Sequence, residues 1–542
     1  MPGGVVPVID TFSESEQKVL APYFTNMDKN VFVLVNLPEV IKGTLFSRYS
    51  RSDKSIRRIL LDEFITNKDI FTIKEGEMPG TPSILAKEKA EAFYERVLVG
   101  YGDDSVAELA GAHIACEAVS SLVGDILTDS RIGISPLEKS ARYVLFDKKV
   151  NGEYLWYKEP KIMESKHADL YSNYMNKIFD CYTKWIPIVM NYVKEVTPRD
   201  PTASDRAFES ACRAKACDIL KNMLPAARLT NLGLYGNGRS FEYLLTKLYS
   251  AGLSEATLIA KEIHEELGKV IPSFVKRSQV SEYIVNRRKD MVAHASRYPI
   301  HKISESGKYV KLIDYDKDGE VNVLAAMLYP YSLTSMEELR QTVRSMNQDE
   351  RKELISAYLS KRRNRRDKAG RALEHLYYTF EVCSNYGMFR DLHRHRVLSI
   401  ERQMITANLG YDLPEELEQV GLAKDYKELM EEAKVVYSTI AKEMPIEAQY
   451  PVPRSFHIRY YMKMNLREVY HLTELRSQKQ GHPDYRKIAQ QMKLLVSTVH
   501  PSLTEYMQVD MNEYALARLE SEKRIDEKMA KLKQKEEQAK ES

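Results

Sequence analysis

The chain has 542 residues, which is long enough for about two to four domains of ordinary size. Hydrophobic residues make up 43% of it and charged residues 29%, the proportions of a globular protein with a buried core. Its 80 lysines and arginines nearly balance its 77 acidic residues, so the net charge of +3 creates no global field that would attract nucleic acid or a membrane surface. Any site for an anion must therefore be local.

The cysteines and the N-terminus indicate the compartment. The five cysteines are scattered, and none has the spacing of a zinc motif, so we interpret them as buried free thiols in a reducing compartment. No apolar run reaches membrane-spanning length, and the start, MPGGVVPVID, lacks the basic and apolar regions of a signal peptide. These features predict a cytoplasmic protein with no membrane partner.

The first half of the chain is predicted to be mainly helical. Residues 1–28 are expected to form a tail with a short helix, and a strand-like run begins at Val31 and breaks at Pro38. Ser105 and Glu108 form a capping box that opens a predicted helix extending to about residue 127. A loop follows, then a tyrosine-rich connecting region to about residue 201, and then further helices that end near residue 278.

The pattern begins anew near residue 308. Residues 308–328 predict a strand, an Asp-Gly turn and then a strand or a helix. Residues 361–371 hold seven basic residues but no aromatic side chain to stack on bases, so a solvated helix or a wall that steers anions is favoured over a nucleic-acid grip. Residues 511–542 predict a charged helix that is frayed or partly disordered because it lacks a broad apolar face.

The stretch from Glu374 to Gln403 is the most informative part of the chain. It is predicted to begin as a helix because apolar residues recur at helical spacing, at Leu373, Leu376, Tyr377, Phe380 and Cys383. It ends in the run His393 to Arg396, whose guanidinium groups suit phosphate or carboxylate. A second predicted helix carries Asn465, Arg467 and Arg476. Charge pattern alone favours a solvated basic face at both places.

The two halves look like repeats of one unit. Pro225 precedes Asn237 by the same spacing that separates Pro453 from Asn465, and an arginine follows two residues after each asparagine. A shared order of motifs indicates an internal duplication better than a single match does. We therefore divide the chain into a tail (1–28), a first repeat (29–280), a linker (281–307), a second repeat (308–510) and a charged tail (511–542).

Each half also carries part of a longer signature of the form RHRxxSxNExSxRY, which follows an element beginning Ser-x-x-Glu-His. The second half has the front of it, at Glu374, His375, Arg394, His395, Arg396 and Ser399. The first half has the back of it, at Ser135, Glu138, Ser140, Arg142 and Tyr143. On these residues the chain resembles the flavin-dependent thymidylate synthase family, over roughly residues 30–280 and 308–505.

Both halves also depart from the family pattern. After Ser399, the family's Asn, Glu, Ser and Arg are replaced by Glu401, Arg402, Met404 and Thr406. The first half replaces the RHR triplet by Ser130, Arg131 and Ile132, and the last arginine of the C-terminal element by Leu248. The arginine that precedes the proline step is replaced in both halves, by Lys221 and by Gln449. Each half thus holds residues that the other has lost.

The resemblance implies an α+β fold, with two tandem repeats of a mainly helical unit that contains a small antiparallel sheet. In the family, four subunits assemble and their active sites lie between subunits. Two tandem chains would accordingly form a homodimer that imitates a tetramer, with about two composite sites built from complementary repeats.

The resemblance also implies a reaction, the reductive methylation of dUMP to dTMP by a methyltransferase that uses FAD, NADPH and methylenetetrahydrofolate. It assigns a catalytic contact with the pyrimidine to Arg476. It assigns flavin binding to Arg394, His395, Arg396, Asn465, Arg467 and Glu374, and binding of dUMP, the phosphate above all, to Glu138, Ser140, Arg142 and Ser399. No metal is expected.

Two other hypotheses stay open. The replacements Lys221, Gln449 and Leu248 and the lost signature after Ser399 fit a degenerate paralogue that binds flavin or nucleotide without making dTMP. A nucleic-acid-binding scaffold that uses residues 361–371 is the least favoured of the three hypotheses.

Overall fold

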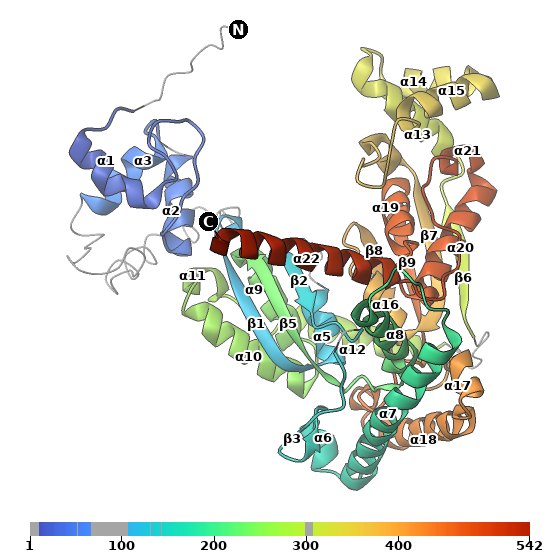
Figure 1. Ribbon diagram of the computed structural model, residues 1–542. Coiled ribbons are helices and arrows are strands. Elements are labelled where there is room, and N and C mark those ends of the chain that lie inside the picture. Colours follow the sequence, from blue (N-terminus) through green and yellow to red (C-terminus); the bar gives the residue numbers. More distant parts are fainter. Residues whose placement is uncertain are drawn as a thin grey trace. The chain divides into compact units, whose positions relative to one another are not determined.

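The computed structural model describes residues 10–50, 52–66, 107–129, 132–142, 144–298 and 307–541 (Figure 1). The chain divides into two compact units, each built from segments that are distant in sequence. The first unit comprises Met1–Glu117, Ile126–Glu138 and Asn231–Pro299, and the second comprises Ala118–Asp125, Lys139–Thr230 and Ile300–Ser542. The second unit therefore combines parts of both sequence halves.

The first unit holds most of a three-stranded sheet of order β1-β5-β2. Its strands are β1 (Gly111–Ser120), β5 (Leu229–Asn237) and β2 (Ile134–Glu138), and the ends of β1 and β5 belong to the second unit. β2 runs antiparallel to β5. The helices of this unit are α1 (Glu14–Leu20), α2 (Glu39–Tyr49), α3 (Ile56–Ile59), a π-helical turn (Leu60–Ile65), α9 (Gly238–Tyr249), α10 (Ser254–Gly268), α11 (Pro272–Val275) and α12 (Glu282–Ala295).

The second unit is built on a four-stranded antiparallel sheet of order β6-β7-β9-β8. Its strands are β6 (Tyr309–Tyr315), β7 (Tyr377–Asn385), β9 (His457–Asn465) and β8 (Leu398–Arg402). Helices drawn from both sequence halves join this unit. They are α6 (Pro160–Met163), α7 (Ala168–Val196), α8 (Asp205–Leu220), α13 (Gly319–Leu328), α14 (Met336–Ser345), α15 (Gln348–Leu359), α16 (Tyr386–Leu392), α17 (Glu415–Gln419), α18 (Ala423–Ala441), α19 (Leu466–Arg476), α20 (Pro483–Val499), α21 (Pro501–Thr504) and α22 (Leu519–Glu541).

Smaller elements complete the second unit. The hairpin of β3 (Lys149–Val150) and β4 (Glu153–Tyr154) precedes α6, and short 3-10 helices occur at Ala21–Tyr23 in the first unit and at Lys221–Met223, Tyr329–Tyr331, Arg371–His375 and Glu447–Gln449 in the second. The helix α5 (Ser121–Thr128) crosses the boundary between the two units. Mixed helices and small antiparallel sheets confirm the predicted α+β class.

The two halves share one topology, which confirms the internal duplication. The order β1-β5-β2 in the first half is the order β7-β9-β8 in the second, and a short helix, α5 or α16, follows the first strand of each set. The repeated asparagine has a structural task in both halves. The side chain of Asn237 accepts from the backbone N–H of Ser240, and that of Asn465 accepts from Glu468, each at 2.9 Å, so both cap the helix that follows.

Within the second unit, the two proline steps contact each other. Pro225 and Pro453 form an antiparallel bridge. The backbone N–H of Ala226 donates to the carbonyl of Val452 at 2.9 Å, and the N–H of Arg454 donates to the carbonyl of Leu224 at 3.1 Å. Equivalent positions of the two repeats thus face each other, which is the pattern of a twofold contact inside a single chain.

Two predicted helices are wrong in their first part. Residues 111–120 and 377–385 form strands, and the helices begin only afterwards, as α5 and α16. The last four residues of β7 are all buried, so the alternation of its first residues stops halfway along the strand, and an apolar run of this kind imitates a helical face. The proposed cap Ser105 lies outside the described residues.

Four other expectations about local structure are corrected. The tyrosine-rich connection contains the 29-residue helix α7, whose aromatic residues form a buried stripe. Residues 361–371 form a loop and not a helix, apart from Arg371, which begins a 3-10 helix. The strand expected from Val31 is reduced to one bridge between Phe24 and Leu34. The C-terminal helix α22 is anchored at its start, where Leu519 packs on the buried Ala203 and Ala211.

Candidate functional site

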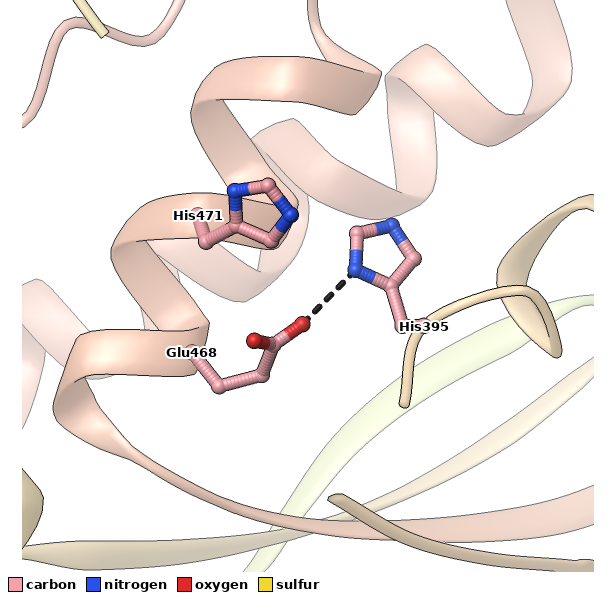
Figure 2. Close-up of side chains that lie close together, drawn as sticks. All are labelled: His395, Glu468 and His471. Atoms are coloured by element: carbon pink, nitrogen blue, oxygen red, sulfur yellow. Dashed lines mark hydrogen bonds and ion pairs between the residues drawn. The ribbon is translucent and has the colours of Figure 1, made fainter. Parts of the chain in front are cut away.

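The basic run that follows α16 has one buried member. His395 is buried, whereas Arg394 and Arg396 on either side of it are exposed. Nδ1 of His395 lies 2.7 Å from Oε1 of Glu468 on α19 (Figure 2). Arg476, at the end of the same helix, donates from its Nε to Nε2 of His395 at 3.0 Å. The histidine therefore joins a carboxyl group to a guanidinium.

Burial sets the protonation of these three groups. It lowers the pKa of His395 well below the usual value, and the charge of Arg476 lowers it further, so the imidazole is neutral at pH 7. Burial raises the pKa of Glu468 to about 8, although the charges of Lys368, Arg476 and Arg467 oppose this shift. Burial also lowers the pKa of Arg476 from 12.5, but a guanidinium stays protonated at neutral pH.

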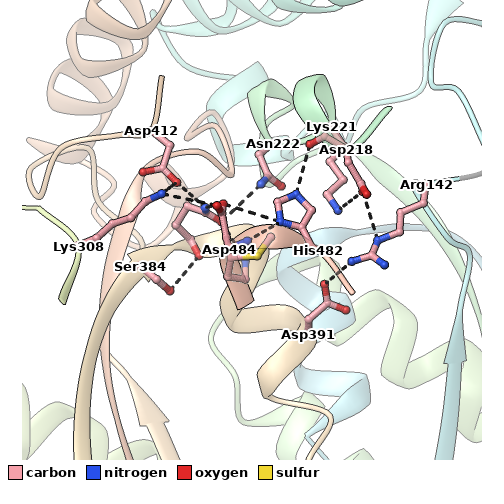
Figure 3. Close-up of polar contacts among 12 residues, drawn as sticks. Arg142, Asp218, Lys221, Asn222, Lys308, Ser384, Asp391, Asp412, His482 and Asp484 are labelled. Atoms are coloured by element: carbon pink, nitrogen blue, oxygen red, sulfur yellow. Dashed lines mark hydrogen bonds and ion pairs between the residues drawn. The ribbon is translucent and has the colours of Figure 1, made fainter. Parts of the chain in front are cut away.

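A second cluster forms around Arg142, which lies in the loop after β2 (Figure 3). Its Nε is 3.2 Å from Oδ1 of Asp218 on α8, and its Nη2 is 3.9 Å from Oδ2 of Asp391 on α16. Nζ of Lys221 donates to the same oxygen of Asp218 at 2.7 Å. Residues from both repeats thus meet in one chain, since Arg142 belongs to the first repeat and Asp391 to the second.

The two carboxylates of this cluster stay ionised. Burial alone would raise the pKa of Asp218, but the charges of Lys221 and Arg142 outweigh it and hold the pKa below its usual value. The same holds for Asp391, where burial is outweighed by the charges of Arg142, Arg394 and Arg476. Burial lowers the pKa of Lys221 to about 8 against the attraction of Asp218.

Tyr485 of α20 connects the two clusters. Its ring centroid lies 5.3 Å from the guanidinium carbon of Arg142 and 5.4 Å from that of Arg476. Two cations therefore contact one aromatic ring, whose negative face attracts both of them. The positive charges of both arginines also lower the pKa of Asp391. Arg476, the catalytic candidate, and Arg142, a substrate-binding candidate, therefore both lie beside Tyr485.

The network of Figure 3 continues away from Arg142 through His482. Nε2 of His482 lies 3.4 Å from the backbone carbonyl of Asp218, and its Nδ1 lies 3.9 Å from Asp484. Lys308 pairs with Asp412 at 2.7 Å and reaches Asp484 at 3.8 Å. Burial lowers the pKa of His482 to about 4, so this histidine is a neutral, structural member of the network.

Three of the predicted flavin-binding residues line one cavity of about 230 Å³, namely Glu374, Asn465 and Arg467. Arg467 donates from Nη1 to Glu374 at 2.7 Å and from Nε to the carbonyl of Ala369 at 2.8 Å. The basic loop 361–371 forms another wall, with Arg362, Arg365 and Lys368. Arg362 is held by two hydrogen bonds to the buried Glu474, at 2.9 and 2.8 Å.

The remaining predicted residues lie as follows. The hydroxyl of Ser140 accepts from the backbone N–H of Arg142 at 3.4 Å. Ser399 lies on the exposed face of β8, opposite Lys463 of β9. Glu138 ends β2 in the first unit, opposite Leu232 of β5. Tyr143, Ser130 and Arg131 lie outside the described residues.

Sequence reasoning missed the partners of the arginines. Asp218, Asp391, Glu468 and Tyr485 were not predicted as site residues, although each contacts one that was. The available signal was weak. Asp218 lies three residues before Lys221 and Asp391 three before Arg394, a spacing that also suits ordinary surface pairs on helices.

His395, Glu468 and His471 are, among the described residues, the one group of three whose ligand atoms lie close enough to hold a metal, all within 4.8 Å of one another (Figure 2). The direction of the hydrogen bonds speaks against that use. A neutral imidazole that binds a metal through Nδ1 carries its proton on Nε2, but Nε2 of His395 accepts a hydrogen bond from Arg476. His395, backed by Glu468, is better suited to orient Arg476.

Two stretches of the chain, residues 58–273 and 311–502, match the sequence model of one protein family, described as thymidylate synthase complementing protein. Together they cover more than half of the chain. The chain belongs to this family. The double match makes it a tandem member of this family, to which the flavin-dependent thymidylate synthases belong, and confirms the resemblance found in the sequence.

The chain matches its relatives in the family over nearly their whole length. A UPF0159 protein of Chlamydia muridarum (strain MoPn / Nigg) is 41% identical over 522 residues, which cover 95% of this chain and 98% of the relative. A UPF0159 protein of Chlamydia pneumoniae is 39% identical over 524 residues, with coverage of 95% and 98%. A UPF0159 protein of Thermoplasma acidophilum is 34% identical over 515 residues, with coverage of 89% and 98%.

Among solved structures, the crystal structure of a UMP/dUMP methylase PolB from Streptomyces cacaoi bound with 5-Br dUMP is 18% identical. The match covers 38% of this chain and 98% of the methylase chain, and its TM-score of 0.31 is too low to carry an argument. In the described part of this chain, no helix combines the length and hydropathy needed to cross a bilayer.

Proposed function

We propose that this chain is a flavin-dependent thymidylate synthase that methylates dUMP to dTMP with methylenetetrahydrofolate and NADPH. The observation that carries the proposal is the meeting of Arg142 with Asp391 and, across Tyr485, with Arg476. The two incomplete signatures complement each other there. Arg142 of the first repeat matches the position of Thr406 in the second, and Arg476 of the second matches that of Leu248 in the first.

The chemistry of the cavity walls fits a flavin dinucleotide. The cavity of about 230 Å³ adjoins a second one of about 600 Å³, and both are lined by Arg365 and Glu474. The second cavity adds Arg366, Lys479 and Arg524, so cations outnumber acids along the joint wall. Such a wall suits a pyrophosphate. FAD bound there would supply the hydride chemistry, with Arg467 and Asn465 beside it.

The protein's own contribution is orientation and charge. Arg476 is held by His395 through Nε, and within the described residues its Nη nitrogens make no hydrogen bond to another side chain or backbone group. They are suited to contact the pyrimidine, whose ionised form a fixed guanidinium favours without giving up a proton. Arg142 and Ser140 would take the phosphate, with Ser399 as a further substrate contact. Arg394 and Arg396 would flank the flavin.

One observation favours the alternative of a degenerate paralogue. Arg142 already faces two carboxylates, Asp218 and Asp391, which compete with a phosphate for the same guanidinium. A chain with this arrangement could bind flavin or nucleotide and yet not form dTMP. The two functions differ in turnover and not in cofactor binding.

The test begins with the absorption spectrum of the purified protein before and after FAD and dUMP are added. A bound oxidised flavin whose spectrum responds to dUMP supports both functions, and dTMP formation with methylenetetrahydrofolate and NADPH selects the synthase. Arg476→Ala and Arg142→Ala should each abolish turnover. A protein that cannot be loaded with flavin would refute the synthase, and one that binds neither flavin nor dUMP would refute both functions. Full turnover of Arg142→Ala would refute the composite site.

We further propose that two chains form a homodimer that imitates the family's tetramer. The twofold contact at Pro225 and Pro453 supports it, because that contact supplies one half of such an assembly inside each chain. Light scattering should give about twice the 62.5 kDa mass of one chain. A monomeric mass with full turnover would refute the proposal.

A further inference from the structure

Glu468 is a buried acid that the sequence signature does not include. Its side chain is 6% exposed, and its partner is Nδ1 of His395, 2.7 Å away. The other face of His395 meets Arg476, so three side chains form one line from the carboxylate to the guanidinium. The line ends at the residue to which we assign the pyrimidine contact.

The hydrogen bonds in this line leave one tautomer for His395. Nε of Arg476 can only donate, so Nε2 of His395 has to be the accepting nitrogen without a proton. The proton of the neutral imidazole therefore lies on Nδ1, where it donates to Oε1 of Glu468. Either protonation state of Glu468 can accept this bond, because a carboxylic acid keeps an accepting oxygen.

The surroundings explain why an acid stands at this position. Lys368 of the basic loop, Arg467 and Arg476 of α19, and the two histidines His395 and His471 face the carboxyl group. In a low-dielectric site with so many cations, an apolar side chain would leave the Nδ1–H of His395 without an acceptor. The tautomer with the proton on Nε2 would then be favoured, and that proton would prevent Nε2 from accepting the hydrogen bond of Arg476.

We propose that Glu468 is a positioning residue that holds Arg476 in its binding orientation by fixing the tautomer of His395. The inference rests on the proposed function for the ligand of Arg476, but the tautomer itself does not depend on it. Glu468→Leu removes the acceptor, whereas Glu468→Gln keeps one in its amide oxygen. The two variants therefore separate loss of the acceptor from loss of the acid.

The first measurement is the 15N NMR spectrum of the full-length protein labelled in histidine, with the His395 signals assigned by their loss in His395→Gln. Imidazole nitrogen shifts distinguish the two tautomers. We expect the proton on Nδ1 in the wild type and in Glu468→Gln, and on Nε2 in Glu468→Leu. A wild-type proton on Nε2 would overturn the inference without any variant, so the test stands even where Glu468→Leu does not fold.

The second measurement is the affinity for dUMP by calorimetry in the presence of FAD. Loss of one hydrogen bond to a charged group corresponds to about 10- to 100-fold weaker binding in Glu468→Leu. Glu468→Gln should recover most of the affinity, and the exposed Glu353→Leu on α15 is the matched control that should bind like the wild type. Wild-type affinity in Glu468→Leu would contradict the inference. If the wild type itself binds no dUMP, the proposed function fails, and the tautomer still decides the inference.

Discussion

Replacement of Asp218 by Asn tests the charge network that joins the two repeats. The substitution keeps the shape of the side chain but removes the charge that Arg142 and Lys221 share. Lys221 can avoid becoming a buried, unpaired cation by releasing its proton. Because its pKa in the folded protein is about 8, release at pH 7 costs about 1.4 kcal/mol.

Arg142 stays charged in the variant, because a guanidinium does not deprotonate in proteins. It loses its ion pair with Asp218 at 3.2 Å, a loss of about 1.5 to 3 kcal/mol for a buried charged donor. It keeps the longer contact with Asp391 at 3.9 Å, a hydrogen bond to the carbonyl of Gln480 at 3.5 Å and the ring of Tyr485. The two contributions add to about 3 to 4 kcal/mol of lost stability around α8. Exposed pairs contribute far less, at most about 1 kcal/mol.

Hydrogen exchange of peptides from α8, read by mass spectrometry, measures this loss locally. We expect protection to fall by about 100- to 1,000-fold in Asp218→Asn at pH 7. The control is Asp205→Asn on the same helix, where the ion pair with Arg199 is exposed and protection should change by less than about fivefold. Equal effects of the two variants would refute the reasoning, since buried and exposed charges would then count alike.

Three further predictions concern other parts of the chain. Glu474→Gln leaves the buried Arg362 without its bidentate partner and lowers the free energy of unfolding by about 3 to 5 kcal/mol. Trypsin should therefore cut the 361–371 loop faster than in the wild type, and an unchanged cleavage rate would contradict this prediction. Gly236→Ala would set a Cβ 2.7 Å from an isoleucine side chain of β2 and lower the free energy of unfolding, measured by urea titration, by about 1 to 3 kcal/mol, whereas Gly233→Ala on the same strand meets nothing within 4 Å and should be neutral. Burial raises the pKa of Glu468 to about 8, so its contribution to stability is complete below pH 4.5 and is lost as the pH rises to about 8. Glu468→Gln should therefore flatten the curve of urea midpoint against pH between these two values. Parallel curves for the variant and the wild type would argue against a buried, protonated acid.

The amino-acid sequence by itself determined the family, the duplication and the helix that carries Arg467 and Arg476. These depend on local order. Asn465 caps a helix wherever it is followed by helix-forming residues, and its repetition at Asn237 is visible without a structure. The Asp-Gly turn after residue 308 was predictable for the same reason, because turn residues act on their immediate neighbours.

Only the tertiary structure decided which apolar runs are strands and which charges meet. The central strand β7 is buried over its last residues, so its sequence lacks the alternation that marks a half-exposed strand. Whether Arg142 pairs with Asp391, or Glu468 faces His395, depends on distances between segments far apart in the chain. The sequence offers many acids and bases at similar local spacing, and burial selects among them because a charge removed from water needs a partner.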